Sequence, residues 1–307
     1  MPVKISPYAL GATLYMPAIR HDILEIIHGE KLSGLKSMVI CFEDALAESQ
    51  LEEAFENFTQ LATQIKLSIK KPLVFIRPRN FDIAIRLIKH CDLSKIDGMV
   101  LPKFTLDSLP IWQEILEDTH LYWLPTLETQ DVFSYLEMQK LADSLSTFKD
   151  KNKILALRIG GNDLMSVLGL RRPRDMTIYD TPLGYVIKML VAVFGSTGFA
   201  LTAPVCELIE NLDILELELK SDIAHGLVGK TAIHPNQIPI IQDAWKVKAS
   251  EFAEAQAIMN AQKAVFQMDG AMCEPATHTT WARNLLERYG AYGLLPNKVQ
   301  EFMTKHN

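Results

Sequence analysis

The stretch LVFIRPRNFDIAIRLI, residues 73–88, contains one complete strand-and-helix unit. Residues 73–76 form a short, wholly apolar run, which is typical of a strand buried on both faces of a parallel sheet. Polar residues follow, and Phe81, Ile85 and Ile88 then recur at three- and four-residue steps, as in an amphipathic helix. This unit indicates an α/β fold in which strands and helices alternate.

Short apolar runs of the same kind recur along the chain, at residues 12–16, 38–42, 98–101, 122–127, 154–159, 198–201 and 227–233. Amphipathic stretches separate them; the one after Glu48 contains Leu51, Phe55 and Phe58 at helical spacing. Eight such units predict a (β/α)8 TIM barrel or a large doubly wound sheet. No G-x-G-x-x-G motif follows a strand, which disfavours the dinucleotide-binding sheet. We therefore expect a barrel over residues 1–245.

The remaining residues, 246–307, exceed what is needed to close a barrel. Their pattern predicts helices over about residues 250–266 and 279–288, with breaks at Gly270 and Pro275. We expect a helical C-terminal extension belonging to the same structural unit, with Glu274 on a turn between helices.

Composition narrows the class of protein. The formal net charge is −6, and no cluster of Lys and Arg suggests a nucleic-acid partner. No run of 18 apolar residues suggests a membrane span. The four cysteines form no C-x-x-C pair, so we interpret them as reduced thiols of a cytoplasmic protein.

The active site of a (β/α)8 barrel lies at the carboxyl ends of its strands. The residues that follow the apolar runs are therefore the candidate functional residues. They are Glu43, Asp44, Arg77, Arg79, Lys103, Glu128, Gly160, Gly161, Asn162, Asp163 and His234.

Two of these carboxylates predict a metal site. Glu128 and Asp163 follow neighbouring strands, so both could reach one point above the barrel mouth. Hard carboxylates without Cys or clustered His favour Mg²⁺. Alternatively, each carboxylate caps the helix that follows it. The Gly160-Gly161 pair favours the first interpretation, because glycine lets backbone N–H groups approach an anion.

The cations allow several functions. Arg77 could bind a substrate carboxylate, form an ion pair with Glu43 or Asp44, or do both. Lys103 could be a Schiff-base nucleophile, although a salt bridge at the barrel rim is the commoner arrangement. His234 is more typical of a hydrogen-bonded loop residue than of a base.

Several short motifs occur in a family-specific order. They are Leu14-Tyr15-Met16-Pro17, Phe42-Glu43-Asp44-Ala45, Arg77 with Asn80, Leu101-Pro102-Lys103, Leu127-Glu128-Thr129, Gly160-x-x-Asp163-Leu164 and Gly229-Lys230-x-x-Ile233-His234-Pro235-x-Gln237-Ile238. Together they give a chain that resembles the citrate lyase β-subunit-like branch of the 2-keto-acid aldolase/citrate lyase family.

This resemblance implies a magnesium-dependent carbon–carbon lyase or aldolase. Its substrate would be a 2-keto or 3-hydroxy carboxylate, as the free acid or as an acyl-CoA thioester. The family's metal ligands correspond to Glu128 and Asp163, and its carboxylate-binding arginine corresponds to Arg77. Gly161 and Asn162 correspond to backbone that holds the substrate's second carboxylate, and we add Lys103 as a further substrate contact. A homo-oligomer, trimer or hexamer, is implied as well.

Departures from the family pattern put the substrate in question. Cys41 stands where an aspartate is usual, and the arginine common on strand one is missing. Related thioester-processing members have a C-terminal aspartate that acts as a base in a neighbouring subunit, and Glu274 stands at that place here. Glu43, Asp44 and Glu274 are therefore the candidate bases.

Two alternatives remain open. The chain could be a free-acid aldolase of the same superfamily, working without any thioester. It could also be a non-catalytic ligand-binding or assembly subunit of a multienzyme complex.

Overall fold

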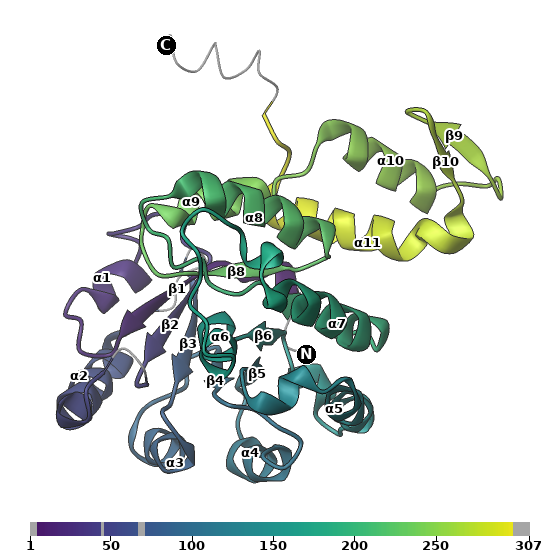
Figure 1. Ribbon diagram of the computed structural model, residues 1–307. Helices are drawn as coiled ribbons and strands as arrows, with labels where there is room; N and C mark the ends of the chain where they lie inside the picture. The colour runs from purple at the N-terminus through teal and green to yellow at the C-terminus, as the bar shows by residue number, and fades with distance from the viewer. Residues whose placement is uncertain (1–4, 44–45, 67–70, 297–307) are drawn as a thin grey trace, which may run out of the picture. The chain divides into compact units, whose positions relative to one another are not determined.

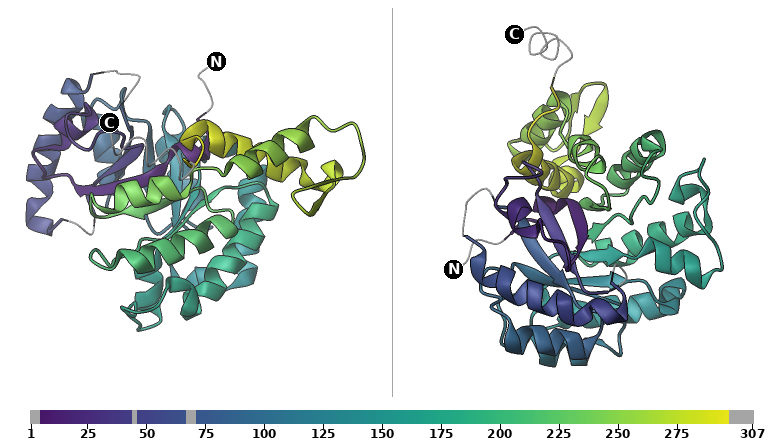
Figure 2. Two further views of the ribbon diagram at one scale, coloured as in Figure 1. Left: turned by 90° about the horizontal axis from the view of Figure 1, so that it is seen from above. Right: turned by 90° about the vertical axis from the view of Figure 1, so that its left-hand side faces the viewer.

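The computed structural model describes residues 5–43, 46–66 and 71–296. The chain forms two compact units, Met1–Ile241 and Gln242–Asn307. In the first unit the strands form an inner layer and the helices lie outside it (Figures 1 and 2). The helices are α1 Ile23–Ile27, α2 Leu51–Gln64, α3 Phe81–His90, α4 Leu109–Leu116, α5 Tyr135–Thr147, α6 Gly161–Val167, α7 Pro182–Ser196 and α8 Leu212–Ala224, and α9 Gln237–Ala244 follows across the boundary.

Eight parallel strands make the barrel. They are β1 Gly11–Pro17, β2 Ser37–Cys41, β3 Leu73–Arg77, β4 Gly98–Leu101, β5 Tyr122–Leu127, β6 Leu157–Ile159, β7 Leu201–Thr202 and β8 Gly229–Ala232. The ladder runs β7-β6-β5-β4-β3-β2-β1-β8. The N–H of Val228 donates to Leu201 at 2.9 Å and that of Ala203 to Gly229 at 2.7 Å, which joins β8 to β7. The predicted (β/α)8 barrel is confirmed.

The interior of the barrel changes character along the strands. At one level it is filled by buried apolar side chains, including Val39, Phe75, Leu124 and Ala156. Successive side chains of a strand alternate between its two faces, so the next inward position lies two residues further on. Those positions are Cys41, Arg77, Thr126 and Arg158, and all four line a cavity. The apolar level closes the barrel below, and the polar level opens at the carboxyl ends of the strands.

Two strands differ from prediction. The apolar run 154–159 contributes only Leu157–Ile159 to β6, and the run 198–201 gives a β7 that begins at Leu201. Ile154 makes a single isolated bridge to Trp123. Apolar composition reports burial, and Ile154, Leu155 and Ala156 are indeed buried, but it does not report strand pairing.

The second unit contains more than helices. It comprises α10 Ala249–Met259, the antiparallel strands β9 Phe266–Met268 and β10 Ala271–Cys273, and α11 Pro275–Tyr292. The predicted helix over residues 250–266 was wrong in its second half, where the hairpin begins. Glu274 lies between β10 and α11 rather than between two helices. The assignment of residues 246–307 to one structural unit with the barrel stays a prediction.

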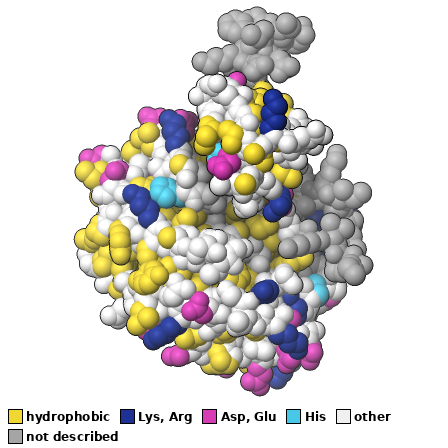
Figure 3. All heavy atoms as spheres, turned by 90° about the vertical axis from the view of Figure 1, so that its right-hand side faces the viewer, with side chains coloured by type: hydrophobic (Ala, Val, Ile, Leu, Met, Phe, Trp, Pro, Cys, Tyr) yellow, Lys and Arg dark blue, Asp and Glu magenta, His cyan; other side chains and the backbone are white. Residues whose placement is uncertain are grey.

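Two further observations concern the types of side chain on the surface and the possibility of a membrane-spanning helix. Figure 3 shows one face, on which acidic and basic side chains are interspersed among apolar ones. In the described part of the chain, no helix has the length and apolar character required to cross a membrane.

Candidate functional site

A cavity of about 400 Å³ opens at the carboxyl ends of the strands of the barrel unit. Its lining includes residues from seven of the eight strands or the loops that follow them. They are Tyr15, Pro17, Cys41, Arg77, Thr126, Glu128, Arg158, Ile159, Gly160, Gly161, Asn162, Asp163, Val205, Thr231 and Ile233. The predicted residues Arg77, Glu128, Gly161, Asn162 and Asp163 are thus brought together.

Glu128 is the most closely held of these side chains. It directly follows β5 and is only 3% exposed. The guanidinium Nη2 of Arg77 donates to its Oε1 at 3.1 Å, and the backbone N–H of Lys103 donates to the same oxygen at 2.8 Å. Lys103 has φ +47°, a conformation rare for residues other than glycine. The hydrogen bond from Lys103 to Glu128 is therefore made by strained backbone.

The environment raises the pKa of Glu128 to about 7. Burial is the largest cause, because it disfavours the charged form. The negative charges of Asp163 and Glu43 act in the same direction, while Arg77 and the Lys103 N–H oppose it. Two carboxylates therefore repel each other in this cavity, which is the electrostatic condition that a cation would relieve.

Gly160 and Gly161 make room for the carboxylates. A Cβ on Gly160 would lie 2.4 Å from Glu128 Cβ and 2.5 Å from its Oε2. A Cβ on Gly161 would lie 2.9 Å from Pro204 Cβ. Asp163 lies in the first turn of α6, immediately after this pair. Gly160 is thus required sterically by the position of Glu128, and Gly161 by that of Pro204.

Arg77 is enclosed by acids. Its Nε forms an ion pair with Glu43, and its Nη2 forms one with Glu128 at 3.1 Å. Burial of Arg77 would lower its pKa, but the groups around it, including Glu128 and Glu43, raise the pKa above its ordinary value. Lys103 Nζ reaches Glu43 at 3.4 Å, so the alternative of rim ion pairs for both cations is present. Asp44 lies outside the described residues.

Three other candidates are not among the residues that line this cavity. Arg79 donates to the carbonyl of Leu46 and to Glu48, and so fastens the loop after β2. His234 Nδ1 lies 2.7 Å from Asn236 Oδ1 in an exposed loop. Glu274 begins α11, and Thr277 Oγ1 donates to its Oε2 at 3.3 Å.

Two carboxylates suit one particular type of metal ion. No grouping of three or more His, Cys, Asp or Glu side chains able to hold a metal occurs within residues 5–43, 46–66 and 71–296. Mg²⁺, however, is usually held by one or two carboxylates and keeps several waters. Glu128 and Asp163, close enough to perturb each other's charge in an open cavity, fit that requirement.

Arg158 is a cavity residue that the sequence reasoning missed. It is 2% exposed and lies within the apolar run that contributes β6. A single charged residue inside an otherwise apolar strand was the available signal, because it predicts a polar contact inside the barrel.

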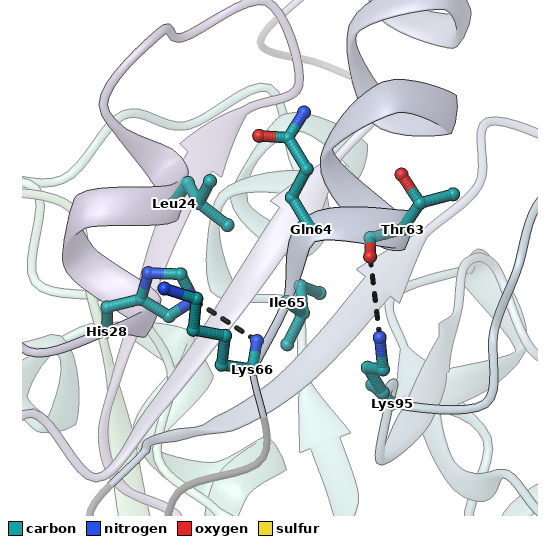
Figure 4. Close-up of a pocket in the computed structure, with 7 residues that line it drawn as sticks. All are labelled: Leu24, His28, Thr63, Gln64, Ile65, Lys66 and Lys95. Carbon is teal, nitrogen blue, oxygen red and sulfur yellow. Dashed lines mark hydrogen bonds between the residues drawn. The ribbon is translucent and has the colours of Figure 1, made fainter.

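A second hollow, of about 730 Å³, lies elsewhere on the barrel unit (Figure 4). Leu24, His28, Thr63, Gln64, Ile65, Lys66 and Lys95 line it. The N–H of Lys66 donates to His28 Nε2 at 3.2 Å, and Lys95 Nζ donates to the Thr63 carbonyl at 3.5 Å. These residues precede strands rather than follow them, so this hollow is at the end of the barrel that carries stability rather than chemistry.

A TIM barrel with a carboxylate-lined cavity at its catalytic end defines the class of the protein. The chain belongs to the family described as "C-C_Bond_Lyase of the TIM-Barrel fold", whose profile matches residues 4–294. It is therefore a carbon–carbon bond lyase, similar to citrate lyase β subunits, as the resemblance in sequence predicted.

Solved structures share the fold. Protein CitE from Mycobacterium tuberculosis, in complex with magnesium, acetoacetate and coenzyme A, is 20% identical with a TM-score of 0.66, over 91% of this chain and 98% of that one. RipC from Yersinia pestis is 18% identical with a TM-score of 0.61, over 80% and 99%. The citrate lyase β subunit from M. tuberculosis, complexed with oxaloacetate and magnesium, is 18% identical with a TM-score of 0.57, over 78% and 99%. A comparison with curated proteins gave no match.

Proposed function

We propose that this lyase is magnesium-dependent and acts on a 2-keto or 3-hydroxy carboxylate, as the free acid or as an acyl-CoA thioester. The observation that carries the proposal is the buried Glu128 carboxylate beside Asp163 in the cavity at the catalytic end of the barrel. The magnesium, acetoacetate, coenzyme A and oxaloacetate bound to the similar structures support the choice of metal and of substrate class.

Each cavity residue has a proposed task. Glu128 and Asp163 would hold Mg²⁺, which when bound supplies positive charge beside a substrate keto oxygen. Arg77 orients Glu128 through its Nη2 and presents a guanidinium to the substrate carboxylate. Gly161 and Asn162, which line the same cavity, would contact the substrate through their backbone.

The proton transfer depends on the substrate. In the cleavage direction, a hydroxyl proton leaves, its oxygen becomes a carbonyl, and the adjacent carbon–carbon bond breaks to leave an enolate. For a free acid we propose Glu43 as the acceptor of this proton, because it lies against Arg77 and Lys103 at the rim. For a thioester we propose Glu274. Asp44 is a third candidate base by its position in the sequence.

The metal assignment is tested by calorimetry with Mg²⁺. Glu128→Gln and Asp163→Asn should each abolish measurable Mg²⁺ binding and all lyase activity, while circular dichroism shows an intact fold. Glu117→Gln, a change at an exposed carboxylate beyond α4, is the matched control and should bind as the wild type does. Unchanged Mg²⁺ affinity in both site variants would refute the assignment.

A further inference from the structure

Arg158 is a buried cation without an acidic partner in the part of the chain that the structure describes. Its Nη2 donates to Thr231 Oγ1, and its guanidinium carbon lies 5.2 Å from the centre of the Tyr15 ring. Its Nη1 is buried and has no hydrogen-bond partner within the described residues. Among those residues, no carboxylate forms an ion pair with Arg158, whereas Arg77 across the cavity is paired with two.

Two threonine hydroxyls share this situation. Thr126 on β5 and Thr202 on β7 are the register partners of Arg158 on β6. Neighbours in register on parallel strands point to the same face of the sheet. Thr126 Oγ1 and Thr202 Oγ1 are both buried and, within the described residues, without a hydrogen-bond partner. One level of the barrel thus holds a guanidinium N–H and two hydroxyls, side by side, with unused hydrogen-bonding capacity.

Energetics favour an anion at this place. Burying an ionised group without a counter-charge is costly, and an unmade buried hydrogen bond adds to that cost. The cation–π contact with the face of Tyr15 offsets part of it. A ring supplies no strong acceptor for the Nη1 hydrogens. The oxygens of an anionic group would offer acceptors to Nη1 and to the two hydroxyls.

We infer that Arg158, Thr126 and Thr202 bind a second anionic group of the substrate. Arg158 and Thr126 line the same cavity as Glu128 and Asp163, so one molecule can reach both ends. This inference rests on the proposed function, and it assigns the substrate to the keto acids that carry a further carboxylate or phosphate. The first carboxylate and keto oxygen lie at the rim, and the second anionic group lies at the polar level formed by β5, β6 and β7.

The test measures binding of three compounds by calorimetry in the presence of Mg²⁺. Pyruvate has one anionic group, oxaloacetate adds a carboxylate, and phosphonopyruvate adds a phosphonate. The wild type should bind one of the last two at least about tenfold more tightly than pyruvate, and the preferred one identifies the second group. Arg158→Met should weaken that compound by about 10- to 100-fold, the range of a charge-assisted hydrogen bond, and leave pyruvate within about twofold.

Controls separate this role from a structural one. Arg86→Met removes a half-exposed arginine between α2 and α3 and should change no affinity. Arg158→Lys should restore part of the affinity lost in Arg158→Met, because lysine carries the positive charge but lacks the planar guanidinium with its paired N–H donors. If Arg158→Met does not fold, Arg158→Lys and the isosteric Thr202→Val replace it in the test. Each should lower the affinity for the dianionic compound several-fold and leave the affinity for pyruvate unchanged.

The inference and the proposed function fail in different ways. Absence of pyruvate binding to the wild type contradicts the proposed function. In that case the anion site is still supported if the wild type binds inorganic phosphate without Mg²⁺ and Arg158→Met does not. If Arg158→Met does not fold, Thr202→Val is used for this comparison. A wild type that binds pyruvate but shows no preference for either dianionic compound overturns the inference. Equal weakening of pyruvate and the dianionic compound by Arg158→Met overturns it as well.

Discussion

At the scale of single residues, the site depends on a residue whose backbone conformation is unusual for its type. Lys103 adopts a left-handed backbone, and the result is an N–H aimed at Glu128 Oε1 at 2.8 Å. Its amine points elsewhere, to Glu43 at 3.4 Å, and the side chain is 59% exposed. An exposed amine that is ion-paired with a carboxylate lacks the desolvated surroundings that activate a Schiff-base lysine. The geometry therefore favours a positioning role for Lys103 over a covalent one.

Lys103 should form no Schiff base. We expect no covalent adduct when the protein is treated with borohydride and a keto acid, and complete loss of activity with EDTA. Lys103→Met should retain most of the Mg²⁺ affinity, because the backbone N–H to Glu128 is kept. Mass spectrometry of the borohydride-treated protein decides the matter: a keto-acid adduct on Lys103 would place the mechanism among lysine aldolases.

The raised pKa of Glu128 should make the stability of the metal-free protein fall with pH. The folded pKa is about 7 and the ordinary value is 4.5, so between these values the folded chain holds a proton that the unfolded chain has released. Stability is therefore lost as pH rises through this window, by about 1.4 kcal/mol per unit and about 3 kcal/mol in all. Urea unfolding at pH 5 and pH 8 measures it.

Glu128→Gln cannot lose that proton. Its stability relative to the wild type should rise between pH 5 and pH 8 by about 3 kcal/mol, and Mg²⁺ should narrow the gap by stabilising the wild type alone. Glu117→Gln should follow the wild type at both pH values. If the free energy of unfolding changes with pH in the same way in the wild type and in Glu128→Gln, the pKa of Glu128 is not raised in the folded protein.

At the scale of elements, sequence patterns predicted what periodicity and burial alone determine. The runs that became β4 and β5 matched the observed strands because each is bounded by a turn. The hairpin of β9 and β10 was missed, although Asp269-Gly270 is a strong hairpin signal: both residues have positive φ, at 47° and 80°. Arg158 was missed because its importance depends on Thr126 and Thr202, which only strand register brings beside it.

Packing of α8 against β8 explains a buried charge cluster that the motif Gly229-Lys230 alone could not reveal. Lys230 on β8 is fully buried, with its Nζ 3.1 Å from Glu218 and 2.9 Å from Asp222 on α8. Burial would raise the pKa of Glu218, but Lys230 and Arg172 hold it below its ordinary value. Arg172 belongs to the segment between α6 and α7, so the cluster fastens that segment to the barrel.

Removal of Lys230 should be among the most damaging single changes. Lys230→Met leaves two carboxylates buried without their shared cation, so we expect a loss of about 3–5 kcal/mol in the free energy of unfolding. Denaturant unfolding measures it. Lys220→Met, at an exposed position of the same α8, should change stability by less than about 0.5 kcal/mol. A small effect at Lys230 would mean that the carboxylates are protonated.

At the scale of the whole molecule, the open question is how the second unit serves the barrel. It has its own core, which includes Val247, Ala255, Ile258 and Leu285, and α10 is fastened to α11 by Glu251 and Arg288 at 3.3 Å. A unit with its own core can hold a residue in a defined position within that unit. Glu274 begins α11, directly after the hairpin, and is the candidate for that residue. The homo-oligomer remains a prediction, and it makes this arrangement testable.

If Glu274 serves as the base on a thioester in a neighbouring subunit, Glu274→Ala should keep Mg²⁺ and keto-acid binding but lower the thioester reaction by about 10²–10⁴, the usual contribution of a general base. Glu274→Asp should restore part of the rate. Mixing subunits gives the sharper test, because a shared site takes its metal ligands from one chain and its base from another. Dissociated and reassembled mixtures of Glu128→Gln and Glu274→Ala, each inactive alone, should regain a fraction of the wild-type rate. If no activity is recovered although mass spectrometry verifies the exchange of subunits, Glu274 and Glu128 of one site belong to the same chain. If the rate of Glu274→Ala is unchanged, Glu274 is not the base, and the proposed metal site is unaffected.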